Sequence, residues 1–362
     1  MTAEMMQTNY PLHRLLIDRT HGGADRQGWL DFSTNINPLG PPPEAIQAYN
    51  QVSTRISSYP PPYPRVLEAQ IADSLGTDSE CVLAANGSTQ LIYLLARVLK
   101  LRSPWIVIPT FSEITNALIA SGSEPSPILT WNRSDFRLDS RDVHAALNSG
   151  ADGIFLGRPN SPTGNLISLE EAAEIAADCH RHDAWCVFDE AFIDFADDSR
   201  SLVQLAGSSA KLLVLRSLTK IYAIPGLRLG YLVGNSKVVG ILRDAIEPWS
   251  VNVAAEAVAL ACLRVSSDFL ARTRDLVVTE RRRIKDGLGL SAKLQVFPSS
   301  ANFIMTRVSN EKNRGDFGRH LRDKRIIARD LSALPGCGPG FYRFGIRMPH
   351  DNDKLIAAAV DY

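Results

Sequence analysis

A lysine that follows an apolar segment is the residue best suited to chemistry in this sequence. In S-L-T-K-I-Y-A-I-P-G-L-R (217–228), Lys220 lies just beyond a predicted strand, with Ser217 three residues before it and Arg228 eight residues after it. A lysine amine can form an imine with an aldehyde, and a hydroxyl beside a guanidinium can hold an anion. The segment therefore suits a lysine that binds an aldehyde cofactor beside a phosphate anchor. A surface loop explains S-x-x-K about equally well when the motif is taken alone.

A carboxylate ends a second apolar segment, C-V-F-D-E, at Asp189. Burying a carboxylate is costly unless it meets a cation. A protonated pyridine nitrogen is such a cation, and an aspartate beside it keeps the ring an electron sink. Taken alone, Asp189 is slightly better explained as a cap of the following helix.

Two other predicted strand ends carry residues that could hold a phosphate and a flat ring. Gly87, Ser88 and Thr89 open a helix, where backbone N–H groups and the helix dipole attract anions, although simple capping is the usual role of such residues. Phe111 follows W-I-V-I-P and could stack on a ring, although a core phenylalanine is commoner. The order of the four segments, each at a predicted strand end, favours the functional interpretation.

The elements that must position these residues alternate between strand and helix. Apolar residues at helical spacing predict a helix over 86–100, and a capping box at Ser168 and Glu171 predicts the start of another. Short apolar runs predict strands at 105–109, 153–157, 185–188, 211–215 and 229–233. This pattern predicts a mostly parallel sheet covered on both faces, with a ligand beyond the carboxyl ends of its strands. After residue 252, a helical stretch over 254–288, further strands and two helices (one near 316–324, one from Asp351) predict a smaller α+β domain.

Composition narrows the class of protein. The 362 residues are 45% hydrophobic and 22% charged, as in a globular chain with more than one domain. Lysine plus arginine equals aspartate plus glutamate at 39 each, so nucleic acid is not an expected partner. The five cysteines form no C-x-x-C pair, and His180 and His182 offer too few ligands, so we expect no disulfide framework and no metal site. No apolar run is long enough to span a membrane and the first residues lack a secretory signal, so we expect a cytoplasmic protein.

Together these motifs resemble the fold-type I pyridoxal-phosphate enzymes of the aminotransferase class I/II family. The turn P-N-S-P-T-G at 159–164 and D-E-A-F at 189–192 add to the resemblance, which runs from about His21 to the C-terminus. Within the family, H-G-G (21–23), the segment 30–42 and P-W-S-V-N (248–252) are most similar to threonine-phosphate decarboxylases of cobalamin biosynthesis. The histidinol-phosphate aminotransferases share the cofactor motifs but resemble the first and last of these segments less.

The resemblance implies an α/β protein with the fold of a fold-type I PLP-dependent transferase. It implies a large domain at 46–253, a small domain built from 1–45 and 254–362, and a homodimer with pyridoxal 5'-phosphate as cofactor. Lys220 would bind the cofactor covalently, Asp189 would meet its pyridine nitrogen and Phe111 would stack on its ring. Its phosphate would be held by Gly87, Ser88, Thr89, Ser217, Arg228 and, from the partner subunit, Tyr59.

The implied substrate is a small phosphorylated amino acid. Arg347 resembles the arginine that takes the substrate carboxylate, and the other positions near the substrate are His21, Gly22, Asn35, Ser161 and Arg329. Ser161 stands where the family has an asparagine, and Phe192 stands where the aminotransferases usually have a tyrosine. The spacing of Y-P-P-P-Y-P around Tyr59 also departs from the family, which leaves the role of Tyr63 open.

The expected reaction is decarboxylation of L-threonine O-3-phosphate to (R)-1-aminopropan-2-yl phosphate and carbon dioxide, which supplies the aminopropanol linker of cobalamin. The alternative is transamination of the histidinol-phosphate type, which uses the same lysine to move a proton. A protein that binds the cofactor without catalysis is a third, less favoured alternative.

Overall fold

The computed structural model describes residues 21–23, 27–131, 133–310 and 315–362. The first 20 residues, where we expected no secretory signal, lie outside this range. Within the described part of the chain, no helix is long and apolar enough to cross a membrane.

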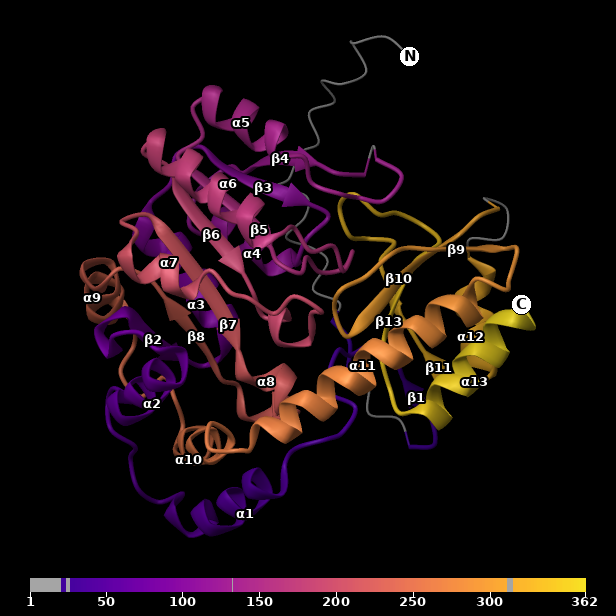
Figure 1. Cartoon of the computed structure of the whole chain (residues 1–362), viewed down its shortest axis with the longest axis horizontal. Coiled ribbons are helices and arrows are strands. Elements are labelled where there is room, and N and C mark those ends of the chain that lie inside the picture. The colour runs from indigo at the N-terminus through magenta and orange to yellow at the C-terminus, as the bar shows by residue number, and fades with distance from the viewer. Residues whose placement is uncertain (1–20, 24–26, 132, 311–314) are drawn as a thin grey trace.

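A seven-stranded sheet forms the centre of the larger part of the molecule (Figure 1). Its order is β2-β8-β7-β6-β5-β3-β4, and only β8 runs antiparallel to its neighbours. The mostly parallel sheet predicted from the sequence is therefore confirmed. The strands are β2 (Val82–Ala85), β3 (Pro104–Ile108), β4 (Ser126–Leu129), β5 (Gly153–Gly157), β6 (Trp185–Asp189), β7 (Leu212–Ser217) and β8 (Gly230–Val233).

Successive residues of the central strands alternate between two hydrophobic clusters, one on each face of the sheet. In β6, Cys186 and Phe188 belong to one cluster, whereas Val187 belongs to the other. Helices α3 (Gly87–Leu99), α4 (Ser112–Ala120) and α9 (Ser236–Ala245) contribute to the second cluster. The first cluster takes in α2 (Arg65–Leu75), α5 (Ser140–Asn148), α6 (Leu169–Arg181) and α7 (Val203–Ser208). Burial on both faces explains why these strands are apolar throughout.

A smaller antiparallel sheet, with order β12-β13-β10-β9, lies on the C-terminal side (Figure 1). Its strands are β9 (Leu294–Val296), β10 (Phe303–Val308), β12 (Arg329–Asp330) and β13 (Phe341–Gly345), accompanied by α12 (Asp316–Asp323) and α13 (Pro349–Val360). Near the other end of the chain, β1 (Leu30–Asp31) pairs in parallel with β11 (Ile326–Ile327). The N-terminal segment thus joins the C-terminal part, as the resemblance implied.

The predicted domain boundaries stay predictions, because α1 (Pro43–Val52) spans the first of them and packs on α10 (Val253–Cys262). Where one helical stretch was expected over 254–288, two helices form, α10 and α11 (Ser267–Leu288). The interruption falls at residues 263–266, between the C-cap of α10 at Leu263 and the N-cap of α11 at Ser266, whose side chain makes no capping hydrogen bond. The cap predicted at Ser168 is confirmed, because its side chain accepts from the Glu171 N–H.

Candidate active site

A cavity of about 400 Å³ opens beyond the carboxyl ends of β5, β6 and β7. The structure brings together there most of the residues singled out from the sequence. These are His21, Gly22, Asn35, Gly87, Ser88, Thr89, Phe111, Ser161, Asp189, Ser217, Lys220 and Arg228. The cavity also reaches Ser33, Phe192 and Arg343, which belong to different parts of the fold.

Lys220 lies in the short helix α8 (Leu218–Ile221), which directly follows β7. Its amine forms no hydrogen bond or ion pair with any residue that the structure describes. Burial lowers the pKa of Lys220 to about 8, and the positive charges of Arg343 and Arg228 contribute to this against the opposing effect of Asp189. With a pKa of about 8, a larger fraction of this amine is uncharged near neutral pH than of an ordinary lysine amine, and the uncharged form is the nucleophile.

Asp189 ends β6, and its Oδ1 accepts a hydrogen bond from the Ala191 N–H at 3.0 Å. Burial raises the pKa of Asp189 to about 6, and Glu190 adds to the rise, against the opposing effects of the Ala191 hydrogen bond and the Lys220 charge. Only one hydrogen bond and the charge of Lys220 stabilise the ionised form of Asp189, so a cation in the cavity would stabilise it further. Asp189 and Lys220 thus fit the two ends of a pyridoxal ring, its nitrogen and its aldehyde.

The first turn of α3 forms a phosphate-sized cradle together with Arg228. Gly87 has φ +79°, and a Cβ atom there would lie 2.7 Å from Arg228 Nη2. A Cβ atom at Gly230 would lie 2.4 Å from the Ser88 nitrogen. Only glycine allows these close approaches, which keep the helix N-terminus and the guanidinium together. Ser217 pairs with Gly230 across β7 and β8, and its hydroxyl lies 2.7 Å from that of Thr219.

Arg343 is the main cavity residue that the sequence analysis missed. It lies in β13 and donates to Ser161 Oγ (3.0 Å) and to the Ser33 carbonyl (3.1 Å). With the Asn35 amide turned so that its oxygen faces the guanidinium, this oxygen accepts from Arg343 Nη1 (3.2 Å) and Nε (3.3 Å). Burial lowers the pKa of Arg343, and the charge of Arg329 contributes. The signal for Arg343 in the sequence was a lone arginine within the apolar run F-Y-R-F. The sequence analysis instead chose Arg347, four residues later, as the substrate-binding arginine.

Arg347 lies outside the residues that line the cavity. Its Nη2 donates to the Asp31 carbonyl and to Thr34 Oγ1 (2.8 Å), and its backbone N–H donates to Asn352 Oδ1 (3.0 Å). It therefore ties the N-terminal segment to the start of α13. Its predicted part in substrate binding stays a prediction.

Arg329 and Tyr59 also lie outside the cavity lining. Arg329 pairs with Arg343 across β12 and β13, so the two side chains share one face of the small sheet. Tyr59 is 84% exposed, and its ring centroid lies 5.4 Å from that of Trp249. An exposed position agrees with a tyrosine that would serve the site of a second copy, which stays a prediction.

The turn before α6 holds Asn160 and Ser161 in different surroundings. Asn160 Nδ2 donates to the Pro109 carbonyl (2.8 Å) and to Thr163 Oγ1 (3.1 Å), and its Oδ1 accepts from Thr110 (3.0 Å). These bonds occupy its amide, so Asn160 is not free to replace the asparagine missing at Ser161. Phe192 also lines the cavity and packs edge-on against Phe303, with ring centroids 5.1 Å apart.

Two residues connect the N-terminal segment to the region around the cavity. The Asn37 N–H donates to the Lys220 carbonyl (3.1 Å), and its side chain donates to the Ile221 carbonyl (2.7 Å). His21 Nε2 lies 3.3 Å from Glu113 Oε1, and its ring lies 6.2 Å from Phe111. Asn37 was not singled out from the sequence, although N-I-N-P marks a turn there.

A partly buried lysine, a partly buried acid and a helix N-terminus beside an arginine meet at the strand ends, and these groups fit an aldehyde cofactor that carries a phosphate. Residues 27–360 match the family model for aminotransferase class I and II, and the chain belongs to that family. Pyridoxal phosphate, the cofactor expected from the resemblance, is confirmed by this membership.

Particular relatives divide between two activities. The chain is 34% identical to the threonine-phosphate decarboxylase of Salmonella typhimurium, over 95% of this chain and 96% of that protein. It is 30% identical to histidinol-phosphate aminotransferase 2 of Archaeoglobus fulgidus, over 91% and 92%. Among solved structures, the histidinol-phosphate aminotransferase of Clostridium acetobutylicum superposes with a TM-score of 0.85 at 26% identity, over 92% of this chain and 98% of that one.

Proposed function

We propose that this protein decarboxylates L-threonine O-3-phosphate to (R)-1-aminopropan-2-yl phosphate and carbon dioxide, and so supplies the aminopropanol linker of cobalamin. The observation that carries the proposal is Arg343, whose guanidinium lines the cavity and donates to Ser161 Oγ and to the Ser33 carbonyl. A guanidinium held in this place suits a carboxylate on the carbon that bears the substrate amine. Threonine phosphate has a carboxylate on that carbon, whereas histidinol phosphate has none. The similarity to the Salmonella enzyme also supports the proposal.

The bound cofactor would supply a ring that accepts the electrons of a bond broken at the substrate Cα. Asp189 would hold the proton of the ring nitrogen, and Phe111 would pack on the ring face. Lys220 would hold the cofactor until the substrate amine displaces it, and its freed amine could then deliver a proton to Cα. Phosphate contacts would come from Gly87, Ser88, Thr89, Ser217 and Arg228.

Arg343 would bind the substrate carboxylate through its planar guanidinium. Its burial and its three fixed acceptors, Ser161, Asn35 and Ser33, give this side chain one orientation. A carboxylate held in one orientation places one Cα bond perpendicular to the ring, which selects the bond that breaks. His21, Gly22 and Arg329 would serve the substrate phosphate.

A homodimer is part of this proposal. Several large apolar side chains are exposed on α1, α2 and the loops near them, namely Ile46, Tyr49, Ile56, Tyr59, Val66 and Trp249. Ile56 and Tyr59 are 80% and 84% exposed. A second copy that covered these side chains would bury apolar surface and bring its Tyr59 to the phosphate cradle of the first.

Transamination of the histidinol-phosphate type is the second candidate, favoured by the 30% identity to the Archaeoglobus enzyme. Phe192 argues against it, because it offers no hydroxyl to the cofactor. One experiment separates the two: the purified protein is given threonine phosphate while carbon dioxide is followed, and histidinol phosphate with 2-oxoglutarate while glutamate is followed. We expect carbon dioxide from the first mixture. Glutamate without carbon dioxide would contradict the proposal.

A further inference from the structure

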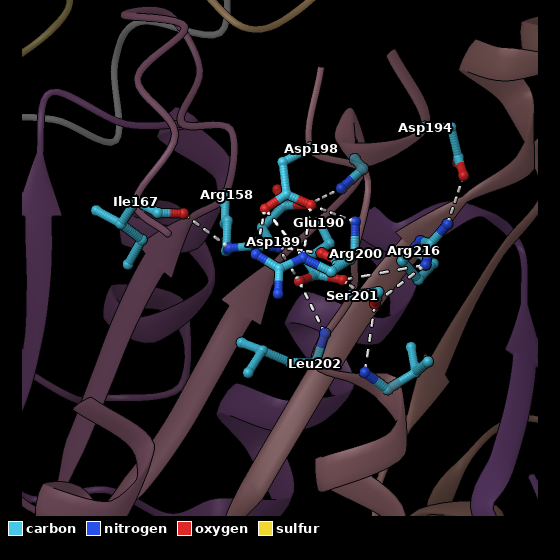
Figure 2. A network of polar contacts seen from close by, with 12 residues as sticks. Arg158, Ile167, Asp189, Glu190, Asp194, Asp198, Arg200, Ser201, Leu202 and Arg216 are labelled. Carbon is cyan, nitrogen blue, oxygen red and sulfur yellow. Dashed lines mark hydrogen bonds and ion pairs between the residues drawn. The ribbon is translucent and has the colours of Figure 1, made fainter. Parts of the chain in front are cut away.

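A network of buried charged side chains, centred on Arg158, Glu190 and Arg216, lies at the ends of β5, β6 and β7 (Figure 2). Arg158 and Glu190 are fully buried, and Arg216 is 7% exposed. None of the three lines the cavity, but each is next to a residue that does. Glu190 follows Asp189, Arg216 precedes Ser217, and the Arg158 N–H donates to the Asp189 carbonyl. Side chains alternate along a strand, so Asp189 faces the cavity and Glu190 faces the network.

Glu190 is the centre of the network. Its Oε1 accepts from Arg158 Nη1 (3.0 Å) and from the Leu202 N–H (3.2 Å), while its Oε2 accepts from Ser201 Oγ. Arg216 Nη1 lies 4.0 Å from the same Oε2. Both carboxylate oxygens of Glu190 thus accept hydrogen bonds, and these bonds and the nearby arginines offset the cost of burying its charge.

The two arginines extend the network to neighbouring loops. Arg158 Nε donates to the Ile167 carbonyl (3.1 Å), and its Nη1 also donates to the Arg200 carbonyl (2.7 Å). Arg216 Nη2 donates to Asp194 Oδ1 (2.7 Å). Burial alone would lower the pKa of Arg216, but the nearby Asp194 and Glu190 carboxylates outweigh it and raise the pKa.

The network joins the ends of the three strands that carry the cavity residues. Arg158 follows β5, and its N–H donates to the Asp189 carbonyl (2.8 Å). Glu190 follows β6, and its N–H donates to the Leu215 carbonyl (2.9 Å). Arg216 lies in β7 directly before Ser217. A shift of any of these charged side chains would therefore move the backbone that carries Asp189 or Ser217.

Stability alone is a weak reason for such a network, because apolar side chains of similar size often stabilise a core as well as a buried ion pair does. The network also has an electrostatic consequence for the cavity. Glu190 raises the pKa of Asp189, so a Glu190 without its arginines would oppose the charge that Asp189 needs.

We propose that Arg158 and Arg216, acting through Glu190, are positioning residues that hold Asp189 in place for the cofactor. The inference goes beyond the proposed function, because it concerns the cofactor site whichever reaction that site performs.

A double-mutant cycle on cofactor affinity tests this inference. Arg158→Met and Glu190→Gln are made alone and combined with Asp189→Asn, and the Kd for pyridoxal phosphate is measured from the visible absorption of the titrated protein. We expect each single change to raise the Kd at least about tenfold in the parent, and by less than about twofold when Asp189 is already Asn. The same fold-change in both backgrounds would overturn the proposal, because the network would then act independently of Asp189.

Activity and stability give two further readouts. If the network positions Asp189, kcat should fall about 10- to 100-fold while the KM for substrate stays within about twofold. A lower melting temperature with unchanged Kd and kcat would mean a purely structural role. If Arg158→Met fails to fold, Arg158→Lys replaces it, because lysine keeps the charge but cannot reach the Ile167 carbonyl, Glu190 and the Arg200 carbonyl together. Its effect on the Kd must likewise fall below about twofold when Asp189 is already Asn.

Arg200→Gln is the matched control. The Arg200 side chain is 57% exposed and pairs with Asp198 and Glu170, while only its carbonyl accepts from Arg158. We expect this change to leave the cofactor Kd within about twofold. A tenfold change from this exposed arginine would show that any local charge matters, and would contradict the assignment to the buried network. Because the Kd needs no substrate, its outcome is independent of whether the protein is a decarboxylase.

Discussion

The two halves of the cavity are built in different ways. Lys220, Asp189 and Ser217 come from the ends of adjacent buried strands of the large sheet, in front of a charge network that ties those ends together. Arg343, Ser33 and Asn35 come from β13 and the N-terminal segment, which are far apart in the sequence. Lys220 and Asp189 thus lie on the large-sheet half, where the charge network connects the strand ends. Arg343, the cation suited to a substrate anion, lies on the small-sheet half.

The halves also differ in charge. The large-sheet half brings a carboxylate, Asp189, and an amine, Lys220, to the cavity, whereas the small-sheet half brings the guanidinium of Arg343, which donates to Ser161 and Ser33. The second half affects the first, since Arg343 helps to lower the pKa of Lys220. A substrate carboxylate bound at Arg343 would offset this effect. We therefore expect substitutions in the large-sheet half to affect kcat most and substitutions in the small-sheet half to affect KM most.

The largest effect is expected from Lys220→Ala, on the order of a 10⁴-fold loss of turnover, because in the proposed function this amine would be both the cofactor's attachment and the proton carrier. Borohydride should fix the cofactor on the peptide that contains Lys220 in the parent protein. Lys237, exposed after the start of α9, is the control, and Lys237→Ala should retain full activity. Mapping of the cofactor to another lysine would contradict the assignment.

A smaller effect, about 100-fold in kcat/KM and mostly in KM, is expected from Arg343→Gln. Loss of a charged hydrogen bond to a substrate carboxylate accounts for this size. Arg347→Gln is the matched comparison, and it should mainly lower the melting temperature, because Arg347 bonds to Asp31 and Thr34. If steady-state kinetics give the larger KM increase for Arg347→Gln, the sequence-based choice of carboxylate arginine is the better one.

The affinity for the cofactor should depend on pH through Asp189. Its pKa of about 6 means that the carboxylate is ionised above pH 6 and protonated below it. The ionised form pairs with a protonated ring nitrogen, so affinity should be full above pH 6 and fall by up to about tenfold per pH unit below it. The cofactor phosphate also titrates near pH 6, so the measurement is the difference from Asp189→Asn. Equal pH profiles would mean that Asp189 does not meet the nitrogen.

The smallest effect is expected from Ser161→Asn, which restores the residue usual in the family. Asparagine brings an amide donor to the cofactor's phenolic oxygen, where Phe192 offers none. Decarboxylation should stay within about threefold or increase, and the pKa of the visible absorption change should fall. A spectral pH titration of both proteins tests this. An unchanged pKa would mean that Ser161 does not reach the cofactor, since Asn160 is held by Pro109 and Thr163.

The large-sheet half could be predicted because its signals are local. A short apolar run followed directly by a polar residue marks a buried strand and its end, and this places Asp189, Lys220 and Phe111 at one edge of a parallel sheet. The Ser168 cap is equally local. The break between α10 and α11 was missed because apolar spacing continues through it and neither proline nor glycine marks it.

The sequence by itself determined the class of fold and the residues at the strand ends, because each follows from patterns within a few residues, and it gave the cofactor through the family resemblance that the motifs carry together. Tertiary structure decided which arginine lines the cavity, because Arg343 lies within β13, where pairing with β10 and β12 orients it, whereas Arg347 lies two residues beyond the strand. It also decided the partners of Glu190, since Arg158, Ser201 and Arg216 meet it only when three strands lie side by side. Contacts between residues far apart in sequence depend on register, and register is a property of the folded sheet.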